Sequence, residues 1–154
     1  MKEMKGAAQP CEGPTAEVLI VDDSHADVRL VEEAFGEARG SARFNVAYDG
    51  EEALAYLKRS GRHAEAPRPD LILLDLNMPR LDGYEVLKRI KADESLKDIP
   101  VIIFSNSAAD QDIRKAYELN ANCYIRKPAE FTGMIDVVRA LETCWLDGRL
   151  CSVA

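Results

Sequence analysis

The chain has 154 residues, of which 20 are Lys or Arg and 27 are Asp or Glu, so its formal net charge is −7. It has the size of one ordinary domain, and 47% hydrophobic with 31% charged residues is the composition of a folded globular protein. An acidic chain has no electrostatic attraction to phosphate backbones, so we expect no direct binding of nucleic acid.

The sequence also argues against a membrane span and an export signal. Apolar runs such as Val18–Val21 are four residues long, whereas a spanning helix needs about 20 predominantly apolar residues. Residues 1–6 contain two lysines, but no apolar stretch follows them. We therefore predict a cytoplasmic protein. Its four cysteines do not have the spacing of metal ligands, and we expect them to be reduced: Cys11, Cys123, Cys144 and Cys151.

The predicted elements alternate between strand and helix after a mobile N-terminal tail, residues 1–16. Short apolar or alternating stretches predict five strands, at 18–21, 43–48, 71–74, 101–104 and 123–125. The helical spacing of apolar residues after each one predicts helices over 24–36, 50–59, 82–92, 108–119 and 129–146. Gly, Pro and charged residues predict a surface loop at 60–69. The predicted domain thus covers 17–146, and a C-terminal tail covers 147–154.

This order of elements predicts an α/β fold. Three of the strands are unbroken apolar runs, which is typical of parallel strands buried on both faces. Five such units with right-handed crossovers give a doubly wound (βα)5 sandwich around a five-stranded parallel sheet. In such folds the functional crevice lies outside the carboxyl ends of the strands, so the residues directly after each strand are the candidate site.

Charged and polar residues follow four of the five strands. They are Asp22 and Asp23 after the first, Asp75 and Asn77 after the third, Ser105 after the fourth, and Lys127 with Pro128 after the fifth. Three close carboxylates repel one another and stay ionised only when a cation neutralises them. Carboxylate and carbonyl oxygens suit Mg²⁺, which binds through one or two carboxylates and a phosphoryl group. The sequence therefore predicts a magnesium site at this edge of the sheet.

The same residues could instead serve structure alone. Ser24 with Asp27, Asp82 with Glu85, and Ser107 with Asp110 are each plausible capping pairs for a helix. The complete set is hard to explain in that way. A carboxylate beside a bound metal can attack phosphorus and form an acyl phosphate, and Lys127 and Ser105 could then donate to the phosphoryl oxygens.

The pattern of Asp22-Asp23, Asp75, Ser105 and Lys127-Pro128 resembles the receiver domain of two-component response regulators, over about residues 17–146. The resemblance implies a flavodoxin-like receiver fold and makes Asp75 the phospho-acceptor. It also implies that Asp23, Asp75 and the main-chain carbonyl of Asn77 hold Mg²⁺, while Asp22 helps through water.

The resemblance also implies a switch. Lys127 would pair with the phosphoryl group, Ser105 would move its hydroxyl toward it, and Tyr124 would be the rotating aromatic residue. Lys127–Pro128 stands where the family usually has a cis peptide bond, which is cheap only before proline. Asn106 departs from the small residue that is common after the switch hydroxyl. Asn77 and Ser107 occupy positions that vary within the family and tune how fast the acyl phosphate hydrolyses. The resemblance therefore implies no particular lifetime for the acyl phosphate.

Two further features narrow the resemblance. The loop at 60–69 and the segment Leu141–Leu146 are similar to those of small regulators that partner bacterial and cyanobacterial phytochromes. The implied partner is a sensor histidine kinase, and the only implied chemistry is self-catalysed phosphotransfer and autodephosphorylation. Few residues follow the last helix, so we expect the output to be protein binding or dimerisation. The expected homodimer forms through the fourth helix, fifth strand, fifth helix and C-terminal tail. The alternative is that the apolar residues of the last helix serve only ordinary core packing.

Two other functions remain as alternatives. An aspartyl-phosphate phosphohydrolase would use Asp75 as its nucleophile, but such enzymes typically need a second carboxylate where this chain has Asn77. A flavodoxin-like protein that binds FMN would need a phosphate-binding loop rich in Ser, Thr and Gly after the first strand. The sequence Asp-Asp-Ser-His at 22–25 has the wrong charge for that role unless a metal intervenes.

Overall fold

The computed structural model describes residues 16–37 and 42–146, except for the side chain of Leu146. Most of the predicted N-terminal tail, the whole C-terminal tail, Cys11 and Cys151 lie outside the described residues. Within the described ranges, no helix has the length and apolar character to cross a membrane.

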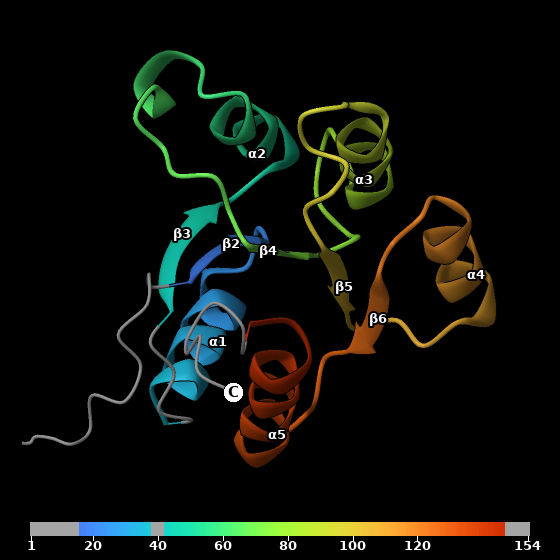
Figure 1. Cartoon of the computed structure of the whole chain (residues 1–154). Helices are drawn as coiled ribbons and strands as arrows, with labels where there is room; N and C mark the ends of the chain where they lie inside the picture. Colours follow the sequence, from blue (N-terminus) through green and yellow to red (C-terminus); the bar gives the residue numbers. More distant parts are fainter. Residues whose placement is uncertain (1–15, 38–41, 147–154) are drawn as a thin grey trace, which may run out of the picture.

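One parallel sheet organises the fold, as predicted (Figure 1). Its strands are β2 (Glu17–Val21), β3 (Arg43–Ala47), β4 (Leu71–Leu74), β5 (Val101–Ser105) and β6 (Cys123–Arg126). They lie in the order β3-β2-β4-β5-β6, so the chain reverses its direction of travel across the sheet after β3. Residues of β4 and β5 are buried throughout, which explains their unbroken apolar sequences.

Helices cover both faces of this sheet. They are α1 (His25–Glu37), α2 (Gly50–Leu57), α3 (Gly83–Ala92), α4 (Asp110–Glu118) and α5 (Phe131–Leu141), with short turns η1 (Gly61–His63) and η2 (Glu142–Leu146). One core cluster joins the sheet to α2, α3 and α4, and a second joins the opposite face to α1 and α5. Figure 1 shows α1 and α5 side by side, and the two helices are in contact. The predicted doubly wound fold is confirmed.

Most predicted helix ends lie within two residues of the structure, and the largest difference is at the end of the last helix. The last helix begins at Phe131 and becomes a wider π-turn after Leu141, instead of running as one helix over 129–146. Ser24 and Asp82 accept hydrogen bonds from the first turns of α1 and α3, as a cap should. Ser107 does not cap α4, because α4 begins only at Asp110 and the Ser107 hydroxyl is used elsewhere.

The register of the strands places the site. Val21 pairs with Leu74 across β2 and β4, so the next residues, Asp22 and Asp75, leave the sheet side by side. At the other pair, Ser105 lies opposite Arg126, and the Lys127 N–H donates to the Ser105 carbonyl at 2.7 Å. The carboxyl ends of β2, β4, β5 and β6 therefore bring residues far apart in the sequence to one edge.

Candidate functional site

Three carboxylates form an acidic cluster at this edge of the sheet, which we define as Asp22, Asp23 and Asp75. One oxygen from each lies within 4.8 Å of the others. Asp22 and Asp75 are 4% and 6% exposed, whereas Asp23 is open to solvent. A set of hard oxygen donors that is buried on one side and open on the other fits a divalent cation such as Mg²⁺ or Mn²⁺.

Burial makes the charge of the acidic cluster costly. Burial, reinforced by the neighbouring charge of Asp22, raises the pKa of Asp75 from 3.8 to about 6, although Lys127 opposes the shift. Burial likewise raises the pKa of Asp22, against hydrogen bonds from Lys127 and from the Ser24 N–H. One ammonium thus leaves the carboxylates under-neutralised, and a bound metal ion would supply the missing positive charge.

The turn after β4 and the start of α3 contact the backbone and carboxylate of Asp75. The Asn77 N–H lowers the pKa of Asp75 through a backbone hydrogen bond, while the Asn77 side chain is exposed. Gly83 begins α3 with its N–H bonded to the Leu76 carbonyl at 3.0 Å. A Cβ on Gly83 would lie 2.3 Å from the Asp75 carbonyl oxygen, so the close approach of α3 to Asp75 requires glycine. The carbonyl of Asn77 as a metal ligand stays a prediction.

Lys127 provides the buried positive charge of the site. Its Nζ lies 2.8 Å from Asp22 Oδ2, 2.7 Å from Asp27 Oδ2 and 3.8 Å from Asp75 Oδ1. Burial by itself would lower the pKa of Lys127, but the hydrogen bonds to Asp22 and Asp27 outweigh it and raise the pKa. The side chain is 5% exposed and stays charged among the carboxylates.

The peptide bond after Lys127 is trans, so the expected cis bond before Pro128 is wrong: no peptide bond among the described residues is cis. The trans isomer is the default even before proline, by about 0.5–1 kcal/mol.

Asp27 is the site residue that sequence reasoning misses. Its position in the sequence marks it only as a capping partner of Ser24, and its N–H does bond to the Ser24 hydroxyl at 3.2 Å. Its carboxylate also reaches Lys127, which lies 100 residues later in the chain. An acidic residue in the first turn of a helix is common because it interacts favourably with the helix dipole. Nothing local in the sequence therefore distinguishes Asp27 from an ordinary first-turn acid.

Ser105 and Tyr124, the two predicted switch residues, are linked through Ser107. Ser105 is fully buried, and its hydroxyl accepts the Ser107 N–H at 3.2 Å. The Tyr124 hydroxyl donates to the Ser107 carbonyl at 2.8 Å. A movement of the Ser105 hydroxyl toward the acidic cluster would therefore disturb the loop that also holds Tyr124.

The same loop is tied to α3 and α4. The Ser107 hydroxyl donates to Asp112 at 2.6 Å, and the Tyr84 hydroxyl donates to the other oxygen of Asp112 at 2.7 Å. Hydrogen bonds from Ser107 and Tyr84 lower the pKa of Asp112, so this carboxylate remains an acceptor. We call Ser107, Asp112, Tyr84 and Tyr124 the Ser107 network. It connects the carboxyl end of β5 with the surface formed by α4 and β6.

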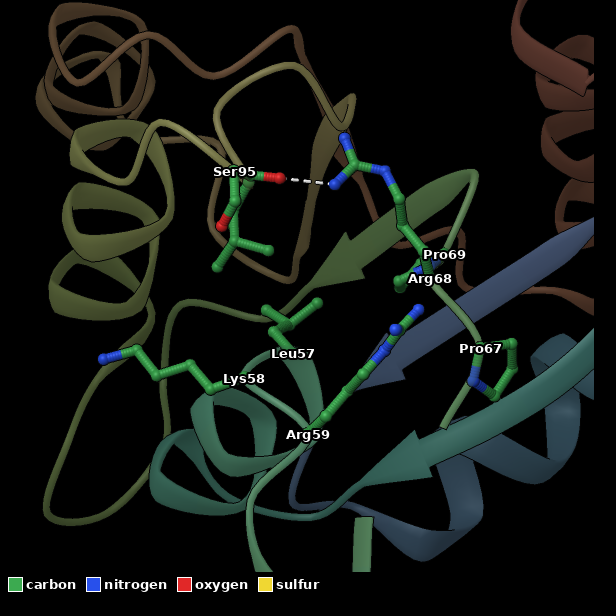
Figure 2. Close-up of a pocket in the computed structure, with 8 residues that line it drawn as sticks. Leu57, Lys58, Arg59, Pro67, Arg68, Pro69 and Ser95 are labelled. Carbon is green, nitrogen blue, oxygen red and sulfur yellow. Dashed lines mark hydrogen bonds between the residues drawn. The ribbon is translucent and has the colours of Figure 1, made fainter. Parts of the chain in front are cut away.

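A hollow of about 440 Å³ lies away from these residues, where α2 ends and where the loops before β4 and β5 pass (Figure 2). Arg59 points into it, and the Arg68 guanidinium donates to the Ser95 carbonyl. Because its walls precede the strands, the hollow lies at the amino edge of the sheet, opposite the acidic cluster. Lys58 and Arg59 at the end of α2 complement the negative end of that helix, which accounts for their charge there.

Comparison with known proteins gives a consistent result. Residues 18–139 match the family described as response regulator receiver domain. The response regulator Rcp1 of the cyanobacterium Synechocystis is 40% identical over 134 residues, which cover 87% of this chain and 91% of that protein.

Solved structures of response regulators are similar to this chain in both sequence and fold. The phosphorylated cyanobacterial phytochrome response regulator RcpA is 44% identical, with a TM-score of 0.81 over 86% of this chain and 94% of that one. The Mn²⁺-bound form of Rcp1 is 39% identical, with a TM-score of 0.79 over 86% and 95% of the two chains.

Proposed function

The chain belongs to the response regulator receiver family, and from that premise we propose that Asp75 accepts a phosphoryl group from a partner histidine kinase. The main support for this proposal is the position of the buried Asp75 carboxylate, with oxygens of Asp22 and Asp23 within 4.8 Å and the Lys127 ammonium at 3.8 Å. We assign the receiver domain to residues 17–146, which the family match over 18–139 supports.

Mg²⁺ is the proposed cofactor, held by Asp23, Asp75 and the Asn77 carbonyl, with Asp22 acting through water. When bound, the metal neutralises charge on the carboxylates and on the transferred phosphoryl group. The acidic cluster supports this choice, and so does the existence of an Mn²⁺-bound form of the relative Rcp1.

The residues of the chain account for the rest of the reaction. An Asp75 oxygen attacks phosphorus, the new O–P bond forms, and the bond from phosphorus to the donor breaks. The electron pair of the broken bond leaves with the donor, which takes up a proton from solvent when the donor is a histidine. Lys127 and the Ser105 hydroxyl are proposed to donate to the phosphoryl oxygens. The Ser107 network would then carry the movement of Ser105 to Tyr124 and α4.

Treatment with acetyl phosphate tests the acceptor directly. In the presence of Mg²⁺ we expect one phosphoryl group per chain, seen as a shifted band on a phosphate-affinity gel and in the intact mass. Chelation of the metal should abolish the labelling, and so should Asp75→Asn. Asp136→Asn, the same change at an exposed position on α5, should label like the wild type. Labelling that survives in Asp75→Asn would show that Asp75 is not the acceptor.

The relatives suggest the pathway. RcpA is a cyanobacterial phytochrome response regulator, and the chain is 44% identical to it. We therefore propose that the partner kinase is a phytochrome and that light is the input. We propose no nucleic-acid partner, in keeping with the net charge of −7, and no enzymatic activity beyond phosphotransfer to Asp75 and its hydrolysis.

We also propose a homodimer through α4, β6 and α5, together with the chain from Trp145 onward, of which 147–154 lie outside the described residues. The 47% exposed Tyr117 on α4 and the link from Ser105 to α4 support this surface. Sedimentation velocity at micromolar concentration, with and without the phosphoryl mimic beryllofluoride, should show a dimer in at least one state. A monomer in both states would exclude the dimer.

A further inference from the structure

Lys127 is held by a carboxylate that is not part of the acidic cluster. Its Nζ is within hydrogen-bonding distance of Asp27, at 2.7 Å, and of Asp22, at 2.8 Å. Its distance to Asp75, 3.8 Å, is too long for a hydrogen bond. Two of the three ammonium protons are therefore directed to Asp22 and to the start of α1, away from the proposed phospho-acceptor.

This arrangement has a consequence for the phosphorylated state. A phosphoryl group on Asp75 needs a charge-assisted hydrogen bond from Lys127, and such bonds are strong only at short distance. Asp27 already occupies one proton of the same ammonium, and it is 30% exposed, so it can be solvated when released. A movement of Nζ from its 3.8 Å distance toward Asp75 would stretch its bond to Asp27, so the phosphoryl group and Asp27 compete for the position of the Lys127 ammonium.

We propose that Asp27 is a positioning residue that holds Lys127 in the unphosphorylated state and restrains phosphorylation of Asp75. This inference rests on the proposed function, because it assigns regulation to the same site. Two effects act in one direction. Asp27 delays the pairing of Lys127 with the phosphoryl group, and its negative charge adds to the repulsion that an anionic phosphoryl donor meets.

The variant Asp27→Asn removes the charge and keeps the shape of the side chain. With acetyl phosphate and Mg²⁺, we expect it to label roughly threefold to tenfold faster than the wild type, the effect of about 1 kcal/mol. The matched control is Glu33→Gln, which removes one negative charge from an exposed position on the same helix. It should label at the wild-type rate. The acceleration should persist at high salt, because a part-buried pair is screened less than surface charges are.

A double-mutant cycle tests the ion pair without any phosphorylation. Urea unfolding is measured for the wild type, Asp27→Asn, Lys127→Met and the double variant, all without metal. Asp27→Asn should lower the midpoint when Lys127 is present and should leave it unchanged or raise it in the Lys127→Met background. If Lys127→Met does not fold, the labelling rates of Asp27→Asn and Glu33→Gln still decide the proposal.

The outcomes separate the two proposals. If the cycle shows coupling between Asp27 and Lys127, and Asp27→Asn labels faster than the wild type, the proposal that Asp27 restrains phosphorylation of Asp75 is supported. Coupling with unchanged or slower labelling overturns it and leaves Asp27 as a structural partner of Lys127. Equal acceleration in Glu33→Gln, or no coupling in the cycle, also overturns it. If wild-type Asp75 is not labelled at all, the proposed function fails and the restraint fails with it, whereas the cycle still reports whether the pair exists.

Discussion

Replacing Asp75 by asparagine is expected to stabilise the metal-free protein near neutral pH by roughly 3 kcal/mol, even though it removes the proposed phospho-acceptor. Burial and the charge of Asp22 raise the pKa of Asp75 from 3.8 to about 6. Each unit of that shift corresponds to about 1.4 kcal/mol of destabilisation when the carboxyl is ionised. Asparagine fills the same space without a charge, so it relieves this cost.

The dependence on pH follows from the same shift. The native carboxyl keeps its proton to a higher pH than the unfolded one, so the native state binds more protons between pH 3.8 and about 6. The contribution of Asp75 to the free energy of unfolding should therefore rise as the pH falls through this window, which the difference between the wild type and Asp75→Asn isolates. Burial raises the pKa of Asp22 as well, which adds to the effect. Asp75→Asn should show a shallower dependence.

Urea unfolding in a chelating buffer at several pH values measures both quantities. Asp136→Asn is the control for loss of an exposed carboxylate and should follow the wild type. Addition of Mg²⁺ should stabilise the wild type more than Asp75→Asn, since a ligand that binds only the native state raises its stability. If the free energy of unfolding depends on pH in the same way for the wild type and Asp75→Asn, the pKa of Asp75 is not raised by burial.

Gly83→Ala should destabilise the protein by about 3 kcal/mol, near the upper end of the usual cost of overpacking. The added Cβ would lie 2.3 Å from the Asp75 carbonyl oxygen and 2.7 Å from the Leu76 Cα. Both contacts are with backbone, which cannot rotate out of the way. Either α3 or the end of β4 must move, so Mg²⁺ binding at Asp75 should weaken together with stability.

Gly36→Ala is the matched control for Gly83→Ala. Gly36 is also helical, in α1, and a Cβ there meets nothing within 4 Å. Alanine should stabilise that position by about 0.5–1 kcal/mol through its better helix propensity. Chemical unfolding and metal titration of both variants test the pair. A Gly83→Ala protein as stable as the wild type would show that α3 does not press on Asp75.

The sequence was sufficient to predict the sheet and the edge where the site lies. The unbroken apolar runs of β2, β4 and β5 determine which strands are buried, and parallel pairing then aligns their carboxyl ends. Asp22, Asp75, Ser105 and Lys127 could be placed together by this reasoning alone. The family resemblance added their expected roles.

Two features near the site could not be predicted from the sequence, one a contact between distant segments and the other the start of a helix. The Lys127–Asp27 pair depends on how the start of α1 lies relative to the end of β6, and a local pattern carries no record of that packing. The start of α4 depends on Ser107, whose hydroxyl bonds to Asp112 and to the Ala109 N–H instead of capping the helix. Asp27 keeps its local bond to Ser24 and adds a distant one to Lys127, whereas Ser107 uses its hydroxyl in local bonds other than the expected cap.

The parallel register of β2 and β4 makes the site independent of loop length. Asp22 and Asp75 are neighbours because Val21 pairs with Leu74, whatever the chain does between the two strands. Residues can therefore be gained or lost around 60–69 without moving either carboxylate, whereas a one-residue insertion within β4 would turn Asp75 to the other face of the sheet. Tolerance to insertion thus belongs to the loops, and the strands must keep their length to the residue.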